Sequence, residues 1–339
     1  MRLRQPPTPP LPPSTTFTNR TAIITGSNTG IGLSTARHLL SLHPKTLILA
    51  CRNTTSATST RSTLLSEFPS TTTTILIKHL DLSTYASVRS FAKEIRSEVD
   101  ILDLLVLNAG SAFFADFKIG EEGRERTVQN MFLCNALLVL ELLDKLTESK
   151  GRVTWVGSRR AYEPMQQHTL HNIGSGSGSI LDLFDQKEGY DMMRRYGEAK
   201  FLCLGFFYEL ARRVKDKQTE GDGEGKGKGK KVVVNMVCPG AVRSSLARNL
   251  PLSYRPLVWL YQRLVSRSPE EGAVLVLNAG LVVGEESHGV FFGDDKVERM
   301  HPFFESQEGK QILKSIWQET MAELKKVVVI PEYLLAGAA

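Results

Sequence analysis

Residues 21–32 read TAIITGSNTGIG, and this stretch decides the fold. Its first five residues, TAIIT, form a short apolar run rich in β-branched side chains, which is typical of a buried strand. Three glycines follow, and the periodic sequence STARHLLSLH at 34–43 then predicts a helix. A strand, a glycine-rich turn and a helix in this order begin a βαβ unit, which builds parallel sheets.

The same alternation continues along the chain. Apolar runs predict further strands at 47–51, 74–82, 102–108, 151–157 and 232–240, with a short strand at 289–293. Helical patterns lie at 85–98, 124–147, 195–214, 251–265, 269–283 and 307–326. Apolar strands that alternate with amphipathic helices predict an α/β protein with a doubly wound parallel sheet of the Rossmann type and helices on both faces.

The chain of 339 residues is expected to form a single domain over 19–330. A proline-rich tail at 1–18 precedes it and is predicted to be disordered, as is the low-complexity loop at 216–231. The glycine- and serine-rich stretch at 172–179 is expected to be a flexible insert. Residues 244–300 are predicted to cover the substrate side.

Composition narrows the class of protein. A hydrophobic fraction of 41% and a charged fraction of 23% are ordinary for a soluble globular protein. Much of the net charge of +6 lies in segments expected to be unfolded, and no basic stripe is interleaved with aromatic residues, so nucleic-acid binding is not predicted. No run approaches the ~20 apolar residues of a membrane span. The four cysteines are scattered rather than spaced as a disulfide framework or a metal site, which favours a reducing, cytoplasmic location without metal.

The glycine-rich turn is a candidate nucleotide site. A pyrophosphate must lie against backbone N–H groups at a helix N-terminus, where side chains would block its approach. Glycines at 26, 30 and 32 remove Cβ atoms at this place. The candidate ligands of the turn are Gly26, Ser27, Asn28, Gly30, Ile31 and Gly32.

The residue after the second strand selects the nucleotide. NAD sites place an acid about 20 residues beyond the glycine motif, where it accepts hydrogen bonds from the ribose. This chain has Arg52 there, 20 residues after Gly32, and no acid. A guanidinium can hold a 2′-phosphate, so NADP(H) is the expected cofactor.

These motifs together resemble the short-chain dehydrogenase/reductase family in its NADP-preferring, classical form, including fungal secondary-metabolism and retinol-dehydrogenase-like members. The resemblance covers roughly residues 20 to 325 and adds candidate cofactor residues, which are Asp81, Leu82, Asn108, Ala109, Gly110, Pro239, Gly240, Val242 and Ser244. It also implies that Ser158, Tyr196 and Lys200 are catalytic, because they match the family's serine and its Tyr-x-x-x-Lys signature. Tyr196 and Lys200 are implied to touch the cofactor as well.

The chemistry of the pair is intelligible from the residues. A tyrosine hydroxyl titrates near pH ~10, so it needs a stabilised phenolate to act as an acid–base near neutrality. Lys200 lies one helical turn after Tyr196 on the same face and can supply that stabilisation. Ser158 would hydrogen-bond the substrate carbonyl while Tyr196 transfers the proton.

The sequence departs from the family pattern at the asparagine expected in the fourth helix. Alignment of the apolar pattern places Met131 there, with Asn130 one residue earlier. One residue is about 100° of helix rotation, so Asn130 can be the fourth catalytic residue only if the helix is locally distorted. Asn135 is the fallback, and loss of this residue is a further alternative.

Two segments bear on the substrate. Ser158 and Tyr196 are 38 residues apart, so the insert at 172–179 either forms a mobile lid or is an ornamental loop. Residues 244–267 are apolar and aromatic, which suits a bulky lipophilic ketone or alcohol. Core packing, a dimer contact and an interfacial membrane anchor are alternatives for this segment.

The predicted function is NADP(H)-dependent reduction of a ketone or aldehyde, or oxidation of the alcohol, in a small lipophilic molecule of fungal secondary metabolism. The alternatives are a catalytically impaired NADP-binding regulator or scaffold and a membrane-surface retinoid or steroid dehydrogenase. The resemblance leaves a homo-oligomer open.

Overall fold

The computed structural model describes residues 5–163, 178–220 and 231–335, and only the backbone of 216–220. These residues form one eight-stranded sheet in the order β3-β2-β1-β4-β5-β6-β7-β8. The strands are β1 (Thr21–Thr25), β2 (Thr46–Cys51), β3 (Thr74–His79), β4 (Leu104–Leu107), β5 (Arg152–Val156), β6 (Val233–Cys238), β7 (Phe291–Gly293) and β8 (Lys296–Glu298). All neighbours pair in parallel except β7 and β8, so the predicted doubly wound fold is confirmed.

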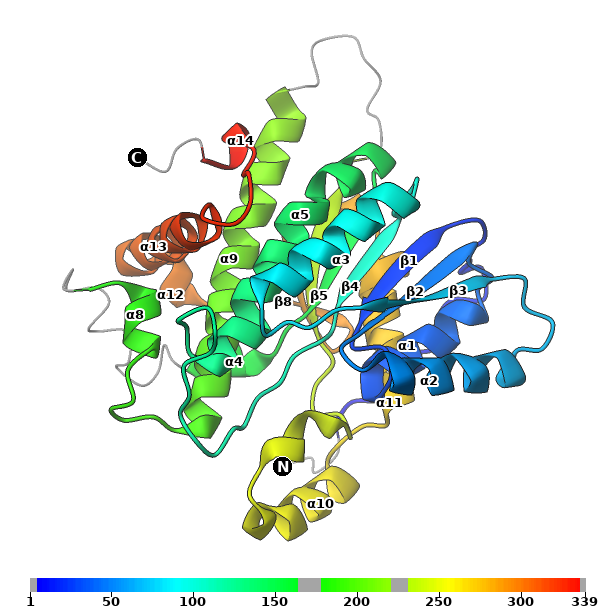
Figure 1. The fold of residues 1–339 in the computed structure, drawn as a ribbon, viewed down its shortest axis with the longest axis horizontal. Helices are drawn as coiled ribbons and strands as arrows, with labels where there is room; N and C mark the ends of the chain where they lie inside the picture. The colour runs from blue at the N-terminus through cyan, green and yellow to red at the C-terminus, as the bar shows by residue number, and fades with distance from the viewer. Residues whose placement is uncertain (1–4, 164–177, 221–230, 336–339) are drawn as a thin grey trace.

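Helices cover both faces of the sheet (Figure 1). One face carries α3 (Tyr85–Glu98), α5 (Cys134–Ser149) and α9 (Met192–Glu220), and the other carries α1 (Gly30–Leu40) and α11 (Pro269–Leu277). The remaining helices are α2 (Thr54–Glu67), α4 (Arg126–Val128), α8 (Ile180–Phe184), α10 (Arg255–Leu264), α12 (Pro302–Glu305), α13 (Gln307–Leu324) and α14 (Glu332–Leu335). Short 3₁₀ turns lie at Arg159–Tyr162, Ser245–Asn249, Leu252–Tyr254 and Glu285–Ser287.

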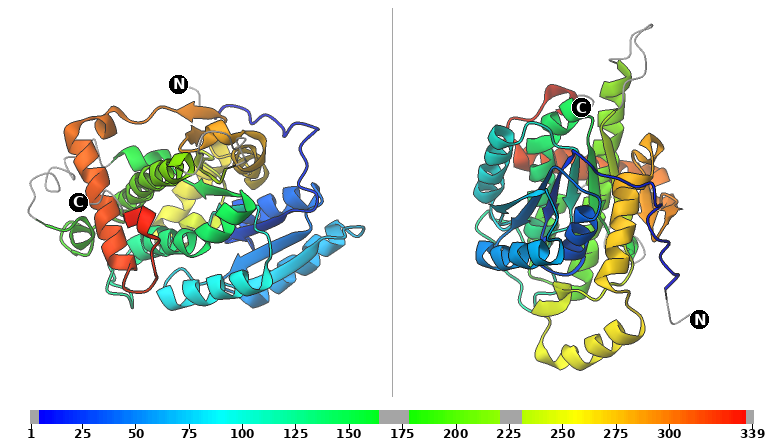
Figure 2. Two further views of the ribbon diagram at one scale, coloured as in Figure 1. Left: turned by 90° about the horizontal axis from the view of Figure 1, so that it is seen from above. Right: turned by 90° about the vertical axis from the view of Figure 1, so that its right-hand side faces the viewer.

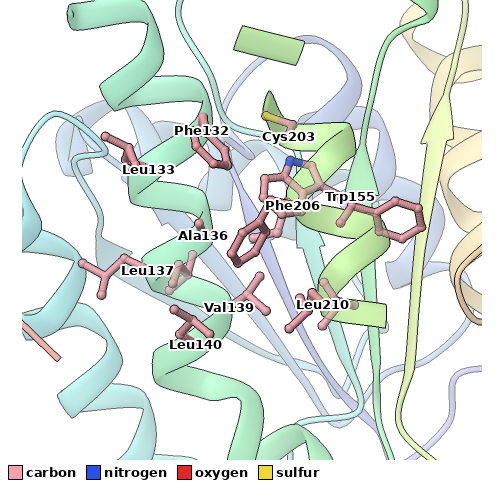
Figure 3. Packing of buried hydrophobic residues seen from close by; sticks show 14 of the residues in the cluster. Phe132, Leu133, Ala136, Leu137, Val139, Leu140, Trp155, Cys203, Phe206 and Leu210 are labelled. Carbon is pink, nitrogen blue, oxygen red and sulfur yellow. The ribbon is translucent and has the colours of Figure 1, made fainter. Parts of the chain in front are cut away.

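Aromatic side chains join the sheet to the α5–α9 layer (Figure 3). The ring of Phe206 in α9 lies 5.9 Å from Phe132 and 6.2 Å from Trp155 in β5, both edge-on. Burying each such side chain contributes about 1.5–3 kcal/mol. In the described part of the chain, one helix, Arg126–Ser149, is apolar enough to cross a membrane, but 89% of its apolar window is buried in this core.

The proline-rich segment is not the disordered tail that its composition predicts, at least over residues 5–18. It has no regular secondary structure and runs along the outside of the domain (Figure 2). Phe17 nevertheless enters the core at 1% exposure, and the side chain of Gln5 is hydrogen-bonded to Ala241 and Val265. Proline excludes helix and sheet here but does not exclude docking through neighbouring side chains.

The disordered loop was predicted to begin at residue 216, but α9 continues to Glu220. Residues 216–220 (DKQTE) contain helix-forming Lys, Gln and Glu, and the glycine-rich part, 221–230, lies outside the described residues. The flexible insert at 172–179 lies outside them as well, except for Gly178 and Ser179. Ser179 caps α8 by accepting a hydrogen bond from the N–H of Asp182.

The predicted substrate-side segment 244–300 divides into parts with different roles. Only 244–266 stands over the end of the sheet, in yellow at the bottom of Figure 1. The apolar residues of α11 are buried instead in the core cluster that includes α1 and the sheet, and β7 and β8 extend the sheet. A π-helical turn, Asn278–Val282, ends α11.

Candidate active site

The turn after β1 has the geometry expected of a phosphate-binding loop. Gly26 and Gly30 have φ values of 66° and 54°, which side chains disfavour. A Cβ on Gly32 would stand 2.4 Å from the carbonyl oxygen of Gly26, so this glycine allows the helix to approach the turn. Ser27 is fully buried, with its hydroxyl 3.2 Å from the thiol of Cys51. Gly32 and Ser27 therefore shape the turn rather than line the site.

The N-terminus of α1 is left open to an anion. Thr29, its N-cap, makes no side-chain capping bond, and the first turn contains no acid. Asn53 and Thr84 do cap α2 and α3, with side chains that accept bonds from Ser56 and Ser87. The uncapped N–H groups of α1 are free to bind a phosphate, and the glycines keep the approach clear. The residues of this turn thus fit a dinucleotide.

A cavity of about 1070 Å³ connects this turn to the carboxyl ends of β4, β5 and β6. The predicted site residues that line it are Gly26, Asn28, Gly30, Ile31, Arg52, Asp81, Leu82, Asn108, Ala109, Gly110, Asn130, Ser158, Tyr196, Lys200, Pro239, Gly240, Val242 and Ser244. The topology brings them together because the carboxyl ends of parallel strands share one edge.

Basic side chains outnumber acidic ones on the cavity wall. The basic residues are Arg52, Arg159, Arg160, Lys200 and Arg248, and among the described lining residues Asp81 is the one acid. Arg159 is paired with Asp294 and Glu298, and Arg160 with Glu163, so Arg52, Lys200 and Arg248 contribute most of the positive charge. Arg52 lies at the end of β2 with an exposed side chain, near the uncapped start of α1. This charge distribution favours an anionic ligand.

Tyr196 on α9 is almost fully buried at the inner end of the cavity. Burial raises the pKa of its hydroxyl to about 12, although a hydrogen bond with Ser158 opposes the rise. Ser158 follows β5 and accepts a hydrogen bond from the N–H of Arg160 at 3.2 Å, which fixes the turn that carries it. The phenol is therefore a proton donor at neutral pH.

Lys200 lies one turn further along α9 and is also buried. Its ammonium donates a 2.8 Å hydrogen bond to the carbonyl oxygen of Val156, at the end of β5. Burial lowers the pKa of this amine. The bond to Val156 anchors the lysine beside Ser158 and Tyr196.

Two residues next to Tyr196 were not predicted from the sequence to belong to the site. The ring of Phe113 lies 4.9 Å from the ring of Tyr196, and the guanidinium of Arg160 lies 5.6 Å from it. Arg160 could have been suspected because it comes two residues after Ser158, but no sequence pattern marks Phe113. Both line the cavity.

The helix that carries Asn130 is distorted as its predicted role requires. A π-helical turn, Gln129–Leu133, separates α4 from α5. Asn130 and Met131 both line the cavity, and the amide of Asn130 donates a 2.7 Å bond to the carbonyl oxygen of Arg126. Asn135 is buried and donates to the carbonyl oxygens of Asn130 and Met131, both at 3.1 Å. Asn135 therefore stabilises the π-helical turn through these two hydrogen bonds.

Apolar side chains line the outer end of the cavity, namely Leu246, Leu250, Tyr254, Leu257, Val258 and Tyr261. Leu257 is 67% exposed and Leu250 is 6% exposed, so the wall changes from buried to open along its length. Such a wall suits a lipophilic molecule that enters from the side of α10.

A Rossmann-type sheet, an open phosphate-binding turn and a buried Tyr-Lys pair in one cavity define a nucleotide-dependent oxidoreductase. The family model for the short chain dehydrogenase matches residues 20–172. Short chain dehydrogenase yanD of Aspergillus niger is 36% identical over 96% of this chain and 97% of its own length, and macD of Penicillium terrestre is 35% identical over 97% and 98%. The chain belongs to the short-chain dehydrogenase/reductase family.

Solved structures agree with this fold at low sequence identity. L-Sorbose reductase from Gluconobacter frateurii, complexed with NADPH and L-sorbose, matches with a TM-score of 0.61 and 17% identity. The match covers 85% of this chain and 99% of that one. The Pseudomonas aeruginosa RhlG/NADP complex matches with a TM-score of 0.59 and 21% identity over 84% and 98%.

Proposed function

We propose that the protein is an NADP(H)-dependent oxidoreductase that reduces a ketone or aldehyde, or oxidises the alcohol, of a small lipophilic molecule. One observation carries the proposal: Ser158, Tyr196 and Lys200 line the same cavity as the uncapped N-terminus of α1. A cofactor phosphate and a reacting carbonyl can therefore occupy opposite ends of one continuous space.

NADP(H) is the cofactor that best suits the cavity wall. Arg52 at the end of β2 can hold a 2′-phosphate, and Lys200 and Arg248 add positive charge to the same wall. Two structural neighbours, the RhlG complex and L-sorbose reductase, hold NADP and NADPH, which is consistent with this choice. The relatives yanD and macD are fungal short chain dehydrogenases, and the proposal extends to a role in fungal secondary metabolism. The four buried, unpaired cysteines support a reducing cytoplasmic location.

The uncapped turn of α1 and Arg52 would hold the phosphates of NADPH, which would supply the hydride when bound. The hydroxyl of Ser158 donates a hydrogen bond to the carbonyl oxygen and orients it. The buried hydroxyl of Tyr196 gives its proton to this oxygen. The guanidinium of Arg160, 5.6 Å from the Tyr196 ring, favours the phenolate left behind, and the ammonium of Lys200, one helical turn away, adds positive charge to the site. Asn130, on the wall beside them, is suited to hold a water that returns the proton.

The proposal is tested by NADPH oxidation against a panel of aromatic and aliphatic ketones. Tyr196→Phe is expected to lower kcat by at least about 10³-fold while leaving NADPH affinity nearly unchanged, because only the proton donor is removed. Tyr333→Phe is the matched control, since Tyr333 lies in α14 and does not line the cavity. Equal turnover by wild type and Tyr196→Phe would overturn the mechanism. Tight NADPH binding without turnover would favour a regulator or scaffold.

A further inference from the structure

The substrate cover, residues 244–264, is joined to the domain through two segments, 239–243 and 265–268, which we call the neck. The two segments are bonded to each other in the manner of parallel strands. The N–H of Arg267 donates to the carbonyl oxygen of Ala241 at 2.8 Å, and the N–H of Arg243 donates to that of Arg267 at 3.0 Å. The position of the cover over the cavity is therefore set at the neck.

Gln5, from the N-terminal segment, binds both halves of the neck. Its amide nitrogen donates to the carbonyl oxygen of Ala241 at 2.7 Å and to that of Val265 at 2.9 Å. Its amide oxygen accepts the N–H of Ala241 at 2.9 Å. Both donors and one acceptor lone pair of the side chain are thus satisfied by main-chain atoms of the neck.

The neck is shaped to receive this side chain. Gly240 has a φ of 76°, and a Cβ there would stand 1.9 Å from the amide oxygen of Gln5. The guanidinium of Arg267 donates to the carbonyl oxygens of Pro6 and Pro239, both at 2.8 Å, and also bonds Asp294. The N-terminal segment, the neck and the end of β7 therefore meet at one buried arginine.

The chain before and after Gln5 favours the docked position. Pro6 and Pro7 follow directly, and a residue before proline is held in extended conformations. Phe17, buried at 1% exposure, fixes the other end of the segment. Less conformational freedom is therefore lost when Gln5 binds the neck.

We propose that Gln5 is a positioning residue that clasps the neck and fixes the substrate cover over the cavity. Gln5 itself lines this cavity, on the side of Pro239, Gly240 and Ala241. The kinetic consequence rests on the proposed function, because it requires the cover to hold a lipophilic substrate. The mechanical consequence, a less mobile cover, does not.

Trp259 in α10 reports on the cover without any assay of activity. The other two tryptophans, Trp155 and Trp317, are buried at 1% and 0% exposure, whereas Trp259 is 62% exposed. Acrylamide therefore quenches chiefly Trp259. The difference between the time-resolved fluorescence anisotropy without and with acrylamide gives the contribution of Trp259, which measures how freely the cover moves. Gln5→Ala is expected to increase the amplitude of the fast anisotropy decay and to leave Tm nearly unchanged.

The kinetic arm uses Gln5→Ala and Gln5→Glu with NADPH and two ketones, one bulky and one small. We expect KM for the bulky ketone to rise about tenfold, as loss of about one hydrogen bond's free energy implies, with a smaller change in kcat and in KM for the small ketone. Gln5→Glu keeps the size of the side chain but places a carboxylate oxygen against two carbonyl oxygens. It should be at least as impaired as Gln5→Ala if hydrogen bonding, rather than space filling, is what matters.

Gln311→Ala, the same substitution on the exposed face of α13, is the matched control and should change neither readout. Unchanged anisotropy and unchanged KM in Gln5→Ala would overturn the proposal, as would wild-type behaviour of Gln5→Glu. If the wild type reduces no ketone, the proposed function fails for that panel, while the anisotropy of Trp259 still decides whether Gln5 clasps the neck.

Discussion

The side chain of Asn108 donates a 2.8 Å hydrogen bond to the carbonyl oxygen of Thr25. The hydroxyl of Thr25 in turn accepts the N–H groups of Asn108 and Ala109, both at 2.9 Å. Thr25 ends β1 and Asn108 follows β4, and these are the neighbouring strands at which the strand order reverses. The glycine-rich turn and the Asn-Ala-Gly segment are therefore one hydrogen-bonded unit.

Asn108→Asp should weaken this unit, because a carboxylate of the same size faces the Thr25 carbonyl oxygen without a proton to donate. We expect a loss of about 1–3 kcal/mol of unfolding free energy and at least about tenfold weaker NADPH binding. Urea unfolding and fluorescence titration measure the two effects. Asn249→Asp, which removes a 2.9 Å bond to the carbonyl oxygen of Ala112 away from the turn, is the control. Unaltered NADPH affinity in Asn108→Asp would contradict the prediction.

The raised pKa of Tyr196, about 12 because of burial, has opposite consequences for the two reaction directions. Reduction needs the protonated phenol, so kcat/KM for the ketone should not decline from tyrosine ionisation between about pH 6 and about pH 9. Alcohol oxidation needs the phenolate, so its rate should rise with pH through the same range. Profiles measured in both directions check this. A reduction rate that declines with an apparent pKa near ~7 would show that another group donates the proton.

Asp294 is expected to stabilise the fold chiefly through Arg267. Burial opposes ionisation of this carboxyl, but hydrogen bonds from Arg267 and Arg159 outweigh it and hold its pKa below the usual value. A lowered pKa in the folded state stabilises the protein at pH values above the unfolded pKa of about 3.9, and this contribution is lost as the pH falls through the folded value. Asp294→Asn leaves the buried Arg267 without its charge partner and should cost about 3–5 kcal/mol at neutral pH.

Urea unfolding of the wild type and Asp294→Asn at pH 7 and near pH ~3 tests this prediction, because the difference should shrink at the lower pH. Asp295→Asn changes the adjacent, exposed carboxylate and serves as the control. A difference that stays constant across this range would mean that the charge of Asp294 is not what stabilises the fold.

The parts of the fold and site that the sequence predicted are those with a local pattern. The strands before Gly26 and Asn108 are short apolar runs, and the glycine turn needs only its own residues to be recognised. The Tyr-x-x-x-Lys spacing likewise places both side chains on one helical face. Because parallel strands end at one edge, the order of these motifs was enough to predict that they meet.

The parts that could not be predicted depend on contacts distant in the sequence. Gln5 lies 236 residues from Ala241, and no local pattern marks the pair. The π-helical turn at Gln129–Leu133 is bonded by the Asn135 amide through the carbonyl oxygen of Asn130, and residue periodicity does not reveal it. The substrate-side segment predicted at 244–300 includes α11 wrongly, because the apolar pattern of this helix does not reveal that it faces the sheet.

Replacing Asn130 and replacing Asn135 should affect kcat and unfolding free energy to different extents. Asn130→Ala removes a group at the cavity wall and is expected to lower kcat at least about tenfold, with a smaller loss of unfolding free energy than Asn135→Ala because it gives up one hydrogen bond, to Arg126. Asn135→Ala removes two bonds that hold the π-helical turn and should cost about 1–3 kcal/mol of stability as well as activity. Steady-state kinetics and urea unfolding of both variants test this. If Asn130→Ala keeps full kcat while Asn135→Ala loses it without destabilisation, Asn135 is the catalytic asparagine.

Arg52 should decide between NADPH and NADH, because its guanidinium is the basic group that ends β2 on the cavity wall. Charge-assisted bonds to a 2′-phosphate contribute about 1.5–3 kcal/mol, so Arg52→Ala should weaken NADPH binding roughly 10- to 150-fold and leave NADH binding nearly unchanged. Arg52→Asp should go further and favour NADH, since a carboxylate repels the phosphate and accepts hydrogen bonds from ribose hydroxyls. The ratio of kcat/KM for the two cofactors measures the effect, and NADPH binding should depend less on salt in both variants.

Arg61→Ala, two turns along α2 and away from the cavity, should leave the ratio unchanged. An unchanged ratio in Arg52→Asp would mean that the preference for the phosphate, if the enzyme has one, resides elsewhere.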